Sequence, residues 1–372
     1  MTRLVRFFFA LAVLVVMLRG LPAGAATTRI TWEPMMLPVT IGGQEFKLDA
    51  ILVYPDDNAR HPLAIVSHGS SRDAGDRPSL TPGESADQML WFVRRGWTVA
   101  AVLRRGYGRS EGGWAEDYGG CQNPNYATAG LRGAADIAAS ISALAANPHV
   151  DASRVLAVGV SAGAFATVAL TTAPPPPGLV AAIAFAPGRG SLASDQVCAE
   201  DRLIAAFKQY GETSRLPLLW ISAQNDHFFD PPLVKKLLAA FDGAGVHTTF
   251  FAAPAYGDEG HFLFSGRDDA ISIWGPPVEA FLTANKLALV DRPLDLAGPA
   301  AAEPQGLGPN GHQAFEHYLL YPPHKAFATT ADGHYHFAYG DRSAGDASKK
   351  ALSFCAKSHE VCAVVNLDGA AP

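Results

Sequence analysis

Serine, aspartate and histidine residues follow one another along the chain in an order that suits nucleophilic catalysis. A serine hydroxyl is a weak nucleophile unless a neighbouring base takes its proton, and that base needs an acidic partner to orient it. Two segments match Gly-x-Ser-x-Gly, one around Ser110 and one around Ser161. Asp226 and His261 follow later in the chain. Which serine can react depends on the elements that hold it.

The surrounding pattern favours Ser161 as the nucleophile. A Gly-x-Ser-x-Gly turn raises its hydroxyl above a sheet only when a strand precedes the serine and a helix follows it directly. Residues 154–160 predict such a strand, and the small residues of 162–172 predict a helix. Ser110 is followed instead by a glycine-rich loop. We expect Ser110 to shape the rim of the site.

The acid and the base are predicted from their places after later strands. Asp226 follows the apolar run 218–222, and His261 lies on the loop after the run 248–252. His227 and Asp258 are the nearest rivals for these two roles. The order Ser161, Asp226, His261 is the chain order that the Gly-x-Ser-x-Gly turn predicts.

Backbone N–H groups must also stabilise the negative oxygen that forms when a serine attacks a carbonyl. Ala162, directly after the nucleophile, is expected to supply one. Ser70 is expected to supply the other from the loop that begins His68-Gly69, with Gly69 and Ser71 as alternatives. We expect His68 to be structural.

The predicted elements place these residues on one sheet. Buried parallel strands are predicted over 63–67, 97–103, 155–160, 180–185, 218–222 and 248–252. Helices are predicted over 85–95, 127–146, 162–172, 202–210, 232–241 and 269–285. Alternating residues over 39–54, around Gly42-Gly43, predict an antiparallel hairpin. The fold class is α/β, with a mostly parallel, doubly wound sheet whose ligands bind beyond the strands' carboxyl ends.

Composition and charge exclude some classes of partner. Of the 372 residues, 48% are hydrophobic and 17% are charged, which is typical of a globular chain. The net charge of −6, without a long basic run, argues against a nucleic-acid partner. We expect no metal and no organic cofactor, because the serine, histidine and aspartate can supply the nucleophile and the base.

Residues 1–25 predict a secretory signal peptide. Arg3 and Arg6 precede an apolar run over 7–18, and residues 23–25, Ala-Gly-Ala, form a suitable cleavage site. The run is short for a membrane helix, which needs about 20 apolar residues, although an uncleaved anchor is the alternative. We expect a periplasmic or secreted protein that contacts the membrane only through this segment before cleavage.

The four cysteines of an exported chain are expected to form two disulfides. Four cysteines allow three pairings, and pairing within each region of the chain is the simplest. A zinc site is the competing reading, but the chain has no CxxC pair. The expected bonds therefore join Cys121 to Cys198, across two long loops that follow strands, and Cys355 to Cys362.

A small module is expected after the catalytic domain. We expect the catalytic domain over 26–296, an Ala/Gly/Pro-rich linker over 297–311 and a disulfide-containing α+β module over 312–372. His334, Tyr335 and His336 alternate along one predicted strand and could hold a metal, although a solvent-facing aromatic strand accounts for them as well. We assign this module no activity, and its protein partner is unknown.

From about residue 45 to 285 the chain resembles the α/β-hydrolase superfamily, and particularly its dienelactone-hydrolase-like branch. The resemblance includes the segment 105–112, Arg-Gly-Tyr-Gly-Arg-Ser-Glu-Gly, which looks like the segment after the fourth strand in such enzymes. Dienelactone hydrolase itself uses a cysteine nucleophile, so its substrate is not carried over to Ser161. Prolyl-oligopeptidase-like hydrolases are similar in kind, but too few residues precede the domain for their β-propeller.

The resemblance and the residues together predict a serine hydrolase that cleaves a small-molecule carboxylic ester through an acyl-enzyme intermediate. Hydrolysis of a peptide or amide bond is the alternative enzymatic reaction. A binding protein built on a hydrolase scaffold is the alternative from another class, and the intact Ser161, His261 and Asp226 set argues against it.

Overall fold

The computed structural model describes residues 27–371 except 173, 246–247, 267 and 359–360. The predicted signal peptide lies outside the described residues. No helix in the described part of the chain has the length and apolar character needed to cross a membrane.

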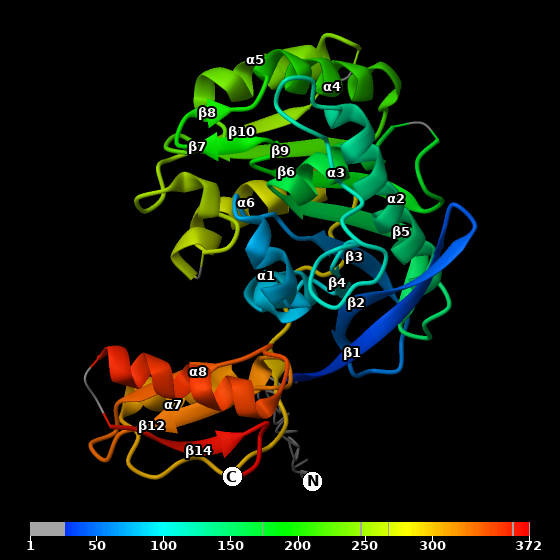
Figure 1. Ribbon diagram of the computed structural model, residues 1–372. Helices are drawn as coiled ribbons and strands as arrows, with labels where there is room; N and C mark the ends of the chain where they lie inside the picture. Colours follow the sequence, from blue (N-terminus) through cyan, green and yellow to red (C-terminus); the bar gives the residue numbers. More distant parts are fainter. Residues whose placement is uncertain (1–26, 173, 246–247, 267, 359–360, 372) are drawn as a thin grey trace, which may run out of the picture.

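A nine-stranded sheet forms the centre of the molecule (Figure 1), in the order β10-β9-β6-β5-β3-β4-β2-β1-β11. Its strands are β1 (Thr28–Ile41), β2 (Gln44–Pro55), β3 (His61–Ser67), β4 (Thr98–Val102), β5 (Val150–Val160), β6 (Leu179–Phe185), β9 (Leu218–Ala223), β10 (Thr249–Ala253) and β11 (Leu296–Ala297). β2 runs antiparallel to its neighbours β1 and β4, and the other pairings are parallel. The predicted, mostly parallel sheet is therefore confirmed.

The first two strands form the expected hairpin. Ile41 pairs with Gln44 across Gly42 and Gly43, whose φ angles are 58° and 81°. Positive φ at both turn residues gives the tight turn that joins twisted antiparallel strands, and glycine adopts it without strain. The hairpin is longer than the expected 39–54, because β1 already begins at Thr28.

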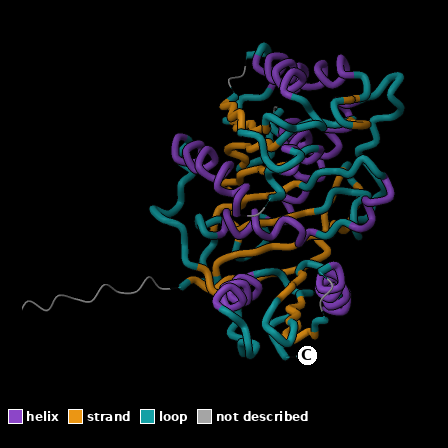
Figure 2. The backbone as a smooth tube through the Cα atoms, turned by 90° about the vertical axis from the view of Figure 1, so that its left-hand side faces the viewer, coloured by secondary structure: helices purple, strands orange, loops and turns teal. Residues whose placement is uncertain are grey.

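Helices cover both faces of the sheet (Figure 2). α2 (Tyr126–Leu144), α3 (Ala162–Leu170), α4 (Glu200–Thr213) and α5 (Pro231–Asp242) share a hydrophobic core with one face. α1 (Ala86–Val93) and α6 (Asp268–Ala284) share a second core with the other face. Shorter elements lie in the connections: η1 (Ala74–Ser79), η2 (Pro82–Ser85), η3 (Gly260–Phe262) and the small hairpin of β7 (Ser191–Ala193) and β8 (Gln196–Val197).

The C-terminal module is a three-stranded antiparallel sheet between two helices, at the end of the molecule that carries β1 (Figure 1). Its elements are α7 (Pro309–Leu320), β12 (Ala326–Thr329), β13 (Tyr335–Ala338), α8 (Ala344–Lys357) and β14 (Ala363–Leu367). Alternate residues of β12 point to opposite faces, so Ala326 and Ala328 pack with α8 while Phe327 packs with α7. α7 begins inside the segment that the sequence predicts as a linker.

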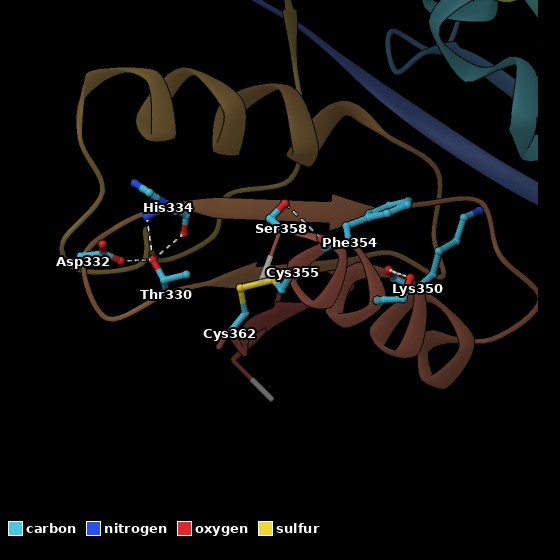
Figure 3. The surroundings of a disulfide bond; sticks show 9 residues. Thr330, Asp332, His334, Lys350, Phe354, Cys355, Ser358 and Cys362 are labelled. Atoms are coloured by element: carbon cyan, nitrogen blue, oxygen red, sulfur yellow. Dashed lines mark hydrogen bonds between the residues drawn. A yellow bond between two sulfur atoms is a disulfide. The ribbon is translucent and has the colours of Figure 1, made fainter. Parts of the chain in front are cut away.

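Two disulfides lie in the described chain, with the expected pairing. Cys121 is bonded to Cys198 in the part of the chain that forms the nine-stranded sheet. Cys355, near the end of α8, is bonded to Cys362, just before β14 (Figure 3). The second bond lies beside the turn in which Thr330 contacts Asp332 and His334.

Candidate active site

Ser161 lies in a sharp turn between β5 and α3. Its φ of 54° and ψ of −121° form a strained backbone conformation for a residue with a side chain. The turn requires close backbone contacts, because a Cβ at position 163 would lie 2.2 Å from the carbonyl oxygen of Ser67. Gly163 thus allows α3 to approach the end of β3. The strand–serine–helix turn predicted from the sequence is present.

The structure brings Ser161, His261 and Asp226 together at the carboxyl end of the sheet. Nε2 of His261 lies 2.9 Å from Oγ of Ser161. Nδ1 of His261 lies 3.0 Å from Oδ2 and 3.1 Å from Oδ1 of Asp226. All three side chains are buried, with at most 7% of each residue exposed. This is the arrangement in which a histidine can accept a serine proton while a carboxylate stabilises the resulting charge.

Backbone and aromatic contacts hold the acid and the base in place. Oδ1 of Asp226 accepts hydrogen bonds from the backbone N–H groups of Phe228 and Phe229, at 2.8 and 3.0 Å. The Phe228 ring stacks on the His261 imidazole, with the ring centroids 4.1 Å apart and 10° between the planes. Glu259 accepts a hydrogen bond from the backbone N–H of His261. These contacts limit rotation of both side chains.

The alternative candidates for the acid, the base and the nucleophile are not part of this hydrogen-bonded chain. His227 is bonded through Nδ1 to Asp195, 3.0 Å away, and this contact raises the pKa of its half-exposed imidazole. Asp258 is exposed. The hydroxyl of Ser110 donates to the carbonyl of Leu103 and accepts from the backbone N–H of Asp49. The first bond closes the loop after β4 on itself and the second ties it to β2, so Ser110 has a structural role.

The two residues predicted to stabilise the oxyanion flank the serine. Ala162 is the first residue of α3, where N–H groups have no acceptor within the helix. Ser70 lies on the loop after β3 and lines both cavities that contain Ser161. Gly69 of this loop is so close that a Cβ there would lie 3.3 Å from Cβ of Ser161. Both residues are near the Ser161 hydroxyl, and their role in catalysis stays a prediction.

His68 fixes the shape of that loop. Its Nε2 accepts a hydrogen bond from the backbone N–H of Arg104 at 3.1 Å, and its Nδ1 lies 2.6 Å from the carbonyl oxygen of Gly69. Burial and the neighbouring Arg104 guanidinium lower the pKa of His68 to about 3. The imidazole is therefore neutral at physiological pH, with its proton on Nδ1, in keeping with the structural role expected for it.

A buried ionic cluster that the sequence analysis missed lies beside the site. Glu116 forms ion pairs with Arg104 and Arg189, and Arg104 also donates to the carbonyl of His68. Burial alone raises the pKa of Glu116, but the two guanidinium groups outweigh it and lower that pKa to about 2. Arg104 directly follows a predicted strand, which was the one available signal. Glu116 lies further along the same loop and Arg189 lies on the loop after β6, and neither shares a spacing pattern with Arg104.

Two cavities meet at Ser161. The larger has a volume of 460 Å³ and extends along the loop after β3, past residues such as Leu80, Leu103, Val160, His261 and Phe262. The smaller has a volume of 130 Å³ and is lined by Arg72, Arg77, Trp114, Tyr118 and Arg189 among others. No acidic residue is among the described residues that line the smaller one. Nε of the buried Arg189 has no hydrogen-bond partner in the described chain.

The Cys121–Cys198 bond joins the two loops that form one side of the smaller cavity. Trp114 and Tyr118 belong to the loop before α2, and residues 188–190 belong to the loop between β6 and β7. The hydroxyl of Tyr126 also donates to the carbonyl of Cys198 at 2.5 Å, and the backbone N–H of Cys198 donates to the carbonyl of Gly190. The bond therefore lies at the rim of the site, where the sequence predicts a disulfide between two loops.

Three side chains of the C-terminal module that lie close together are of types that can bind a metal ion. His336, Cys355 and Cys362 have ligand atoms within 4.8 Å of one another. Both cysteines are bonded to each other, so neither offers a free thiolate. His334, which the sequence analysis considered together with His336, is not in this group.

No family model matches the chain, and no curated protein matches its sequence. Among solved structures it is similar to an esterase of Pyrococcus furiosus, at 17% identity over 68% of this chain and 93% of that chain, with a TM-score of 0.46. A thermophilic esterase of Thermogutta terrifontis has 18% identity over 69% of this chain and 95% of its own, with a TM-score of 0.49. A Klebsiella pneumoniae protein assigned as a dienelactone hydrolase has 15% identity over 69% of this chain and 98% of its own, with a TM-score of 0.47.

The fold follows from the molecule's own topology. The sheet is parallel from β3 to β10, β2 alone is reversed between β1 and β4, and helices cover both faces. Ser161 lies in the strand-to-helix turn after β5, Asp226 lies after β9 and His261 lies after β10. The chain therefore has an α/β-hydrolase fold, with a small α+β module at its C-terminus.

Proposed function

We propose that this protein is a serine hydrolase that cleaves carboxylic esters. Oγ of Ser161 attacks the ester carbonyl carbon while Nε2 of His261 takes the hydroxyl proton. The carbonyl oxygen becomes an oxyanion that receives hydrogen bonds from the backbone N–H groups of Ala162 and Ser70. His261 then returns its proton to the leaving alcohol. Water, deprotonated by the same imidazole, attacks the acyl carbon, and His261 gives that proton to Oγ of Ser161 as the acid is released.

The observation that carries this proposal is the continuous hydrogen-bonded chain from Ser161 through His261 to Asp226. Its two links measure 2.9 and 3.0 Å, and Ser161 faces a 460 Å³ cavity. The positive φ at Ser161 supports it, because such strain is kept where the surrounding structure needs that conformation. A protein that only binds ligands does not need a hydrogen-bonded serine, histidine and aspartate at its cavity. The segment 105–112 supports a place in the dienelactone-hydrolase-like branch.

The charge of the smaller cavity favours esters that carry a negative group. Arg72 and Arg77 contribute guanidinium groups that stack on Phe228 and Trp114, at 3.6 and 3.7 Å from the ring centroids. Glu116 is shared between Arg104 and Arg189, so the buried cluster keeps an excess positive charge. A carboxylate or phosphate on the substrate suits this environment, because Arg binds both through paired N–H groups.

We also propose that the enzyme works outside the cytoplasm. The predicted signal peptide and the two disulfides support a periplasmic or secreted location, since such bonds persist in oxidising compartments.

Labelling with a fluorophosphonate probe tests the assignment. The probe should react with the wild-type protein and with Ser110→Ala, and should not react with Ser161→Ala. Turnover of p-nitrophenyl esters, compared with aminoacyl anilides, separates ester from peptide hydrolysis. Loss of labelling in Ser110→Ala, with retention in Ser161→Ala, would refute the nucleophile. Preferential turnover of the anilides would favour the peptidase alternative.

A further inference from the structure

One wall of the larger cavity is formed by a segment that has few buried residues. Leu80, Thr81, Pro82, Glu84 and Ser85, which lie between β3 and α1, line this cavity. η1 has no buried residue, and η2 buries only Gly83. The segment 78–85, here called the wall segment, therefore depends on neighbouring parts of the molecule for its position.

The C-terminal module packs directly against the wall segment. Gly83 and Gly340 meet backbone to backbone: a Cβ at position 83 would lie 2.7 Å from Cα of Gly340, and a Cβ at position 340 would lie 2.9 Å from Cα of Gly83. Real Cβ atoms do not come so close to backbone atoms, so a side chain on either glycine must push the two segments apart. Gly340 also has a φ of +66°, which a larger residue adopts only with strain.

Polar contacts of the same module lie on both sides of this glycine pair. Arg342 donates a hydrogen bond to the carbonyl of Pro78, at the start of the wall segment. The hydroxyls of Tyr321 and Tyr339 donate to the carboxylate of Asp87, two residues after the segment ends, at 2.6 and 3.2 Å. The two tyrosine rings stack with their centroids 3.8 Å apart and 2° between their planes. The module thus holds the wall segment at its start, middle and end.

We propose that the C-terminal module is a positioning element that sets the shape of the ester-binding cavity through Gly340, Arg342, Tyr321 and Tyr339. The inference rests on the proposed function, because it takes the 460 Å³ cavity as the substrate site. No described residue of the module lines that cavity. The triad is held by the ends of β5, β9 and β10 and does not depend on the wall segment. Loss of the contact should therefore weaken substrate binding and leave the chemical step intact.

The test uses the full-length protein with Gly340→Ala and, from the other side of the contact, Gly83→Ala. Gly333→Ala is a matched control: this module glycine also has a positive φ, +90°, and a Cβ there would lie 2.4 Å from the carbonyl oxygen of Gly306. It strains the module to a similar extent without touching the wall segment. If Gly340→Ala does not fold, a Tyr321→Phe/Tyr339→Phe double variant removes only the hydroxyls that bind Asp87.

The readouts are KM and kcat for p-nitrophenyl esters of graded acyl length, and hydrogen exchange of the amides over 74–85. For Gly340→Ala and Gly83→Ala we expect a rise in KM of about tenfold for long acyl chains, with kcat for the acetate ester little changed. Exchange over 74–85 should become faster in both variants. The control should leave both readouts close to wild type.

Two kinetic results would overturn the proposal: unchanged KM in folded Gly340→Ala, or the same change in KM in Gly333→Ala. Failure of the proposed function is distinct from these results, because it appears as absent fluorophosphonate labelling and absent ester turnover in the wild type. The hydrogen-exchange comparison does not depend on any substrate. Unchanged exchange in Gly340→Ala and Gly83→Ala would show that the module does not hold the wall segment.

Discussion

Nδ1 of His261 lies 3.0 Å from Oδ2 of Asp226, on the side of the ring opposite the bond to Ser161. The carboxylate accepts a hydrogen bond from the Nδ1–H group, so Nε2 carries a lone pair toward the serine hydroxyl. Asp226 is itself fixed by the backbone N–H groups of Phe228 and Phe229. The tautomer that the proposed reaction requires is thus determined by contacts that exist before substrate binds.

Asp226→Asn should lower kcat for p-nitrophenyl acetate by about 10⁴-fold, because an amide can donate to Nδ1 and so favours the wrong histidine tautomer. Steady-state kinetics of the purified variant measures this. His227→Ala is the control and should retain most of the activity, since His227 pairs with Asp195 instead. An Asp226→Asn enzyme with near wild-type kcat would show that another group orients His261.

Glu116 is expected to be essential for stability, because it neutralises two buried guanidinium groups. Glu116→Gln removes this charge and should lower the free energy of unfolding by about 3–5 kcal/mol, as measured by urea denaturation. Glu212→Gln is the control: it breaks the exposed pair with Lys208 and should cost at most about 1 kcal/mol. Equal effects of the two substitutions would contradict the role assigned to the buried cluster.

The buried Glu116 cluster also predicts how the free energy of unfolding depends on pH. The pKa of Glu116 is lowered from 4.5 to about 2 in the folded protein. A carboxyl with a depressed folded pKa stabilises the protein fully above its unfolded pKa and loses this contribution as the pH falls through the folded value. Wild-type stability should therefore decline between about pH 4.5 and pH 2. Urea midpoints across this range should fall less steeply in Glu116→Gln than in the wild type.

The grouping of Ser161, Asp226 and His261 at one end of the sheet was predictable from the sequence, because each residue follows a strand with a continuous apolar run. Ser161, Asp226 and His261 needed only the strand positions and the chain order that the serine turn implies. The early start of β1 at Thr28 was missed, since most residues of its first half are only partly buried and do not alternate clearly. A half-exposed strand that extends along a sheet edge carries little hydrophobic pattern.

Contacts between segments that are far apart in the sequence could not be predicted, because no local sequence pattern indicates them. Glu116 lies on the loop that also carries Arg104 and meets Arg189 from the loop after β6, and its charge has no fixed spacing from theirs. Gly83 and Gly340 look like ordinary turn glycines in the sequence, although their backbones touch. Such pairings depend on how loops fold over the sheet, which the periodicity of single elements does not determine.

The arginines of the smaller cavity should make the enzyme prefer charged esters. We expect a higher kcat/KM for the p-nitrophenyl monoester of succinic acid than for p-nitrophenyl pentanoate, an uncharged ester of similar length. Arg72→Gln and Arg77→Gln should each lower this ratio by about fivefold, the equivalent of ~1 kcal/mol for a partly exposed charge pair. Added salt should reduce it further. Arg202→Gln, an exposed substitution on α4, should leave the ratio unchanged. A wild-type preference for the uncharged ester would rule out an anionic substrate.

The Cys121–Cys198 bond should stabilise the fold more than the second disulfide and should also affect the site. Its cysteines are 77 residues apart, against 7 for Cys355 and Cys362. In the chain-entropy model these separations correspond to about 4 and about 2 kcal/mol of the free energy of unfolding. Thermal and urea denaturation of the two double Cys→Ala variants measures the difference, and the Cys355→Ala/Cys362→Ala protein is the matched control.

Only the Cys121→Ala/Cys198→Ala protein should lose substrate affinity, because its bond ties together the loops that carry Trp114, Tyr118 and Arg189. Its KM for the succinate monoester should rise, while fluorophosphonate still labels Ser161, since the triad is held by strand ends away from the bond. Peptide mapping of the non-reduced protein, expressed in an oxidising compartment, first establishes the pairing. Free thiols at Cys121 and Cys198, or crossed bonds to Cys355 or Cys362, would contradict the clamp. An equal rise in KM after removal of either disulfide would show that the effect comes from general loosening and not from the rim of the site.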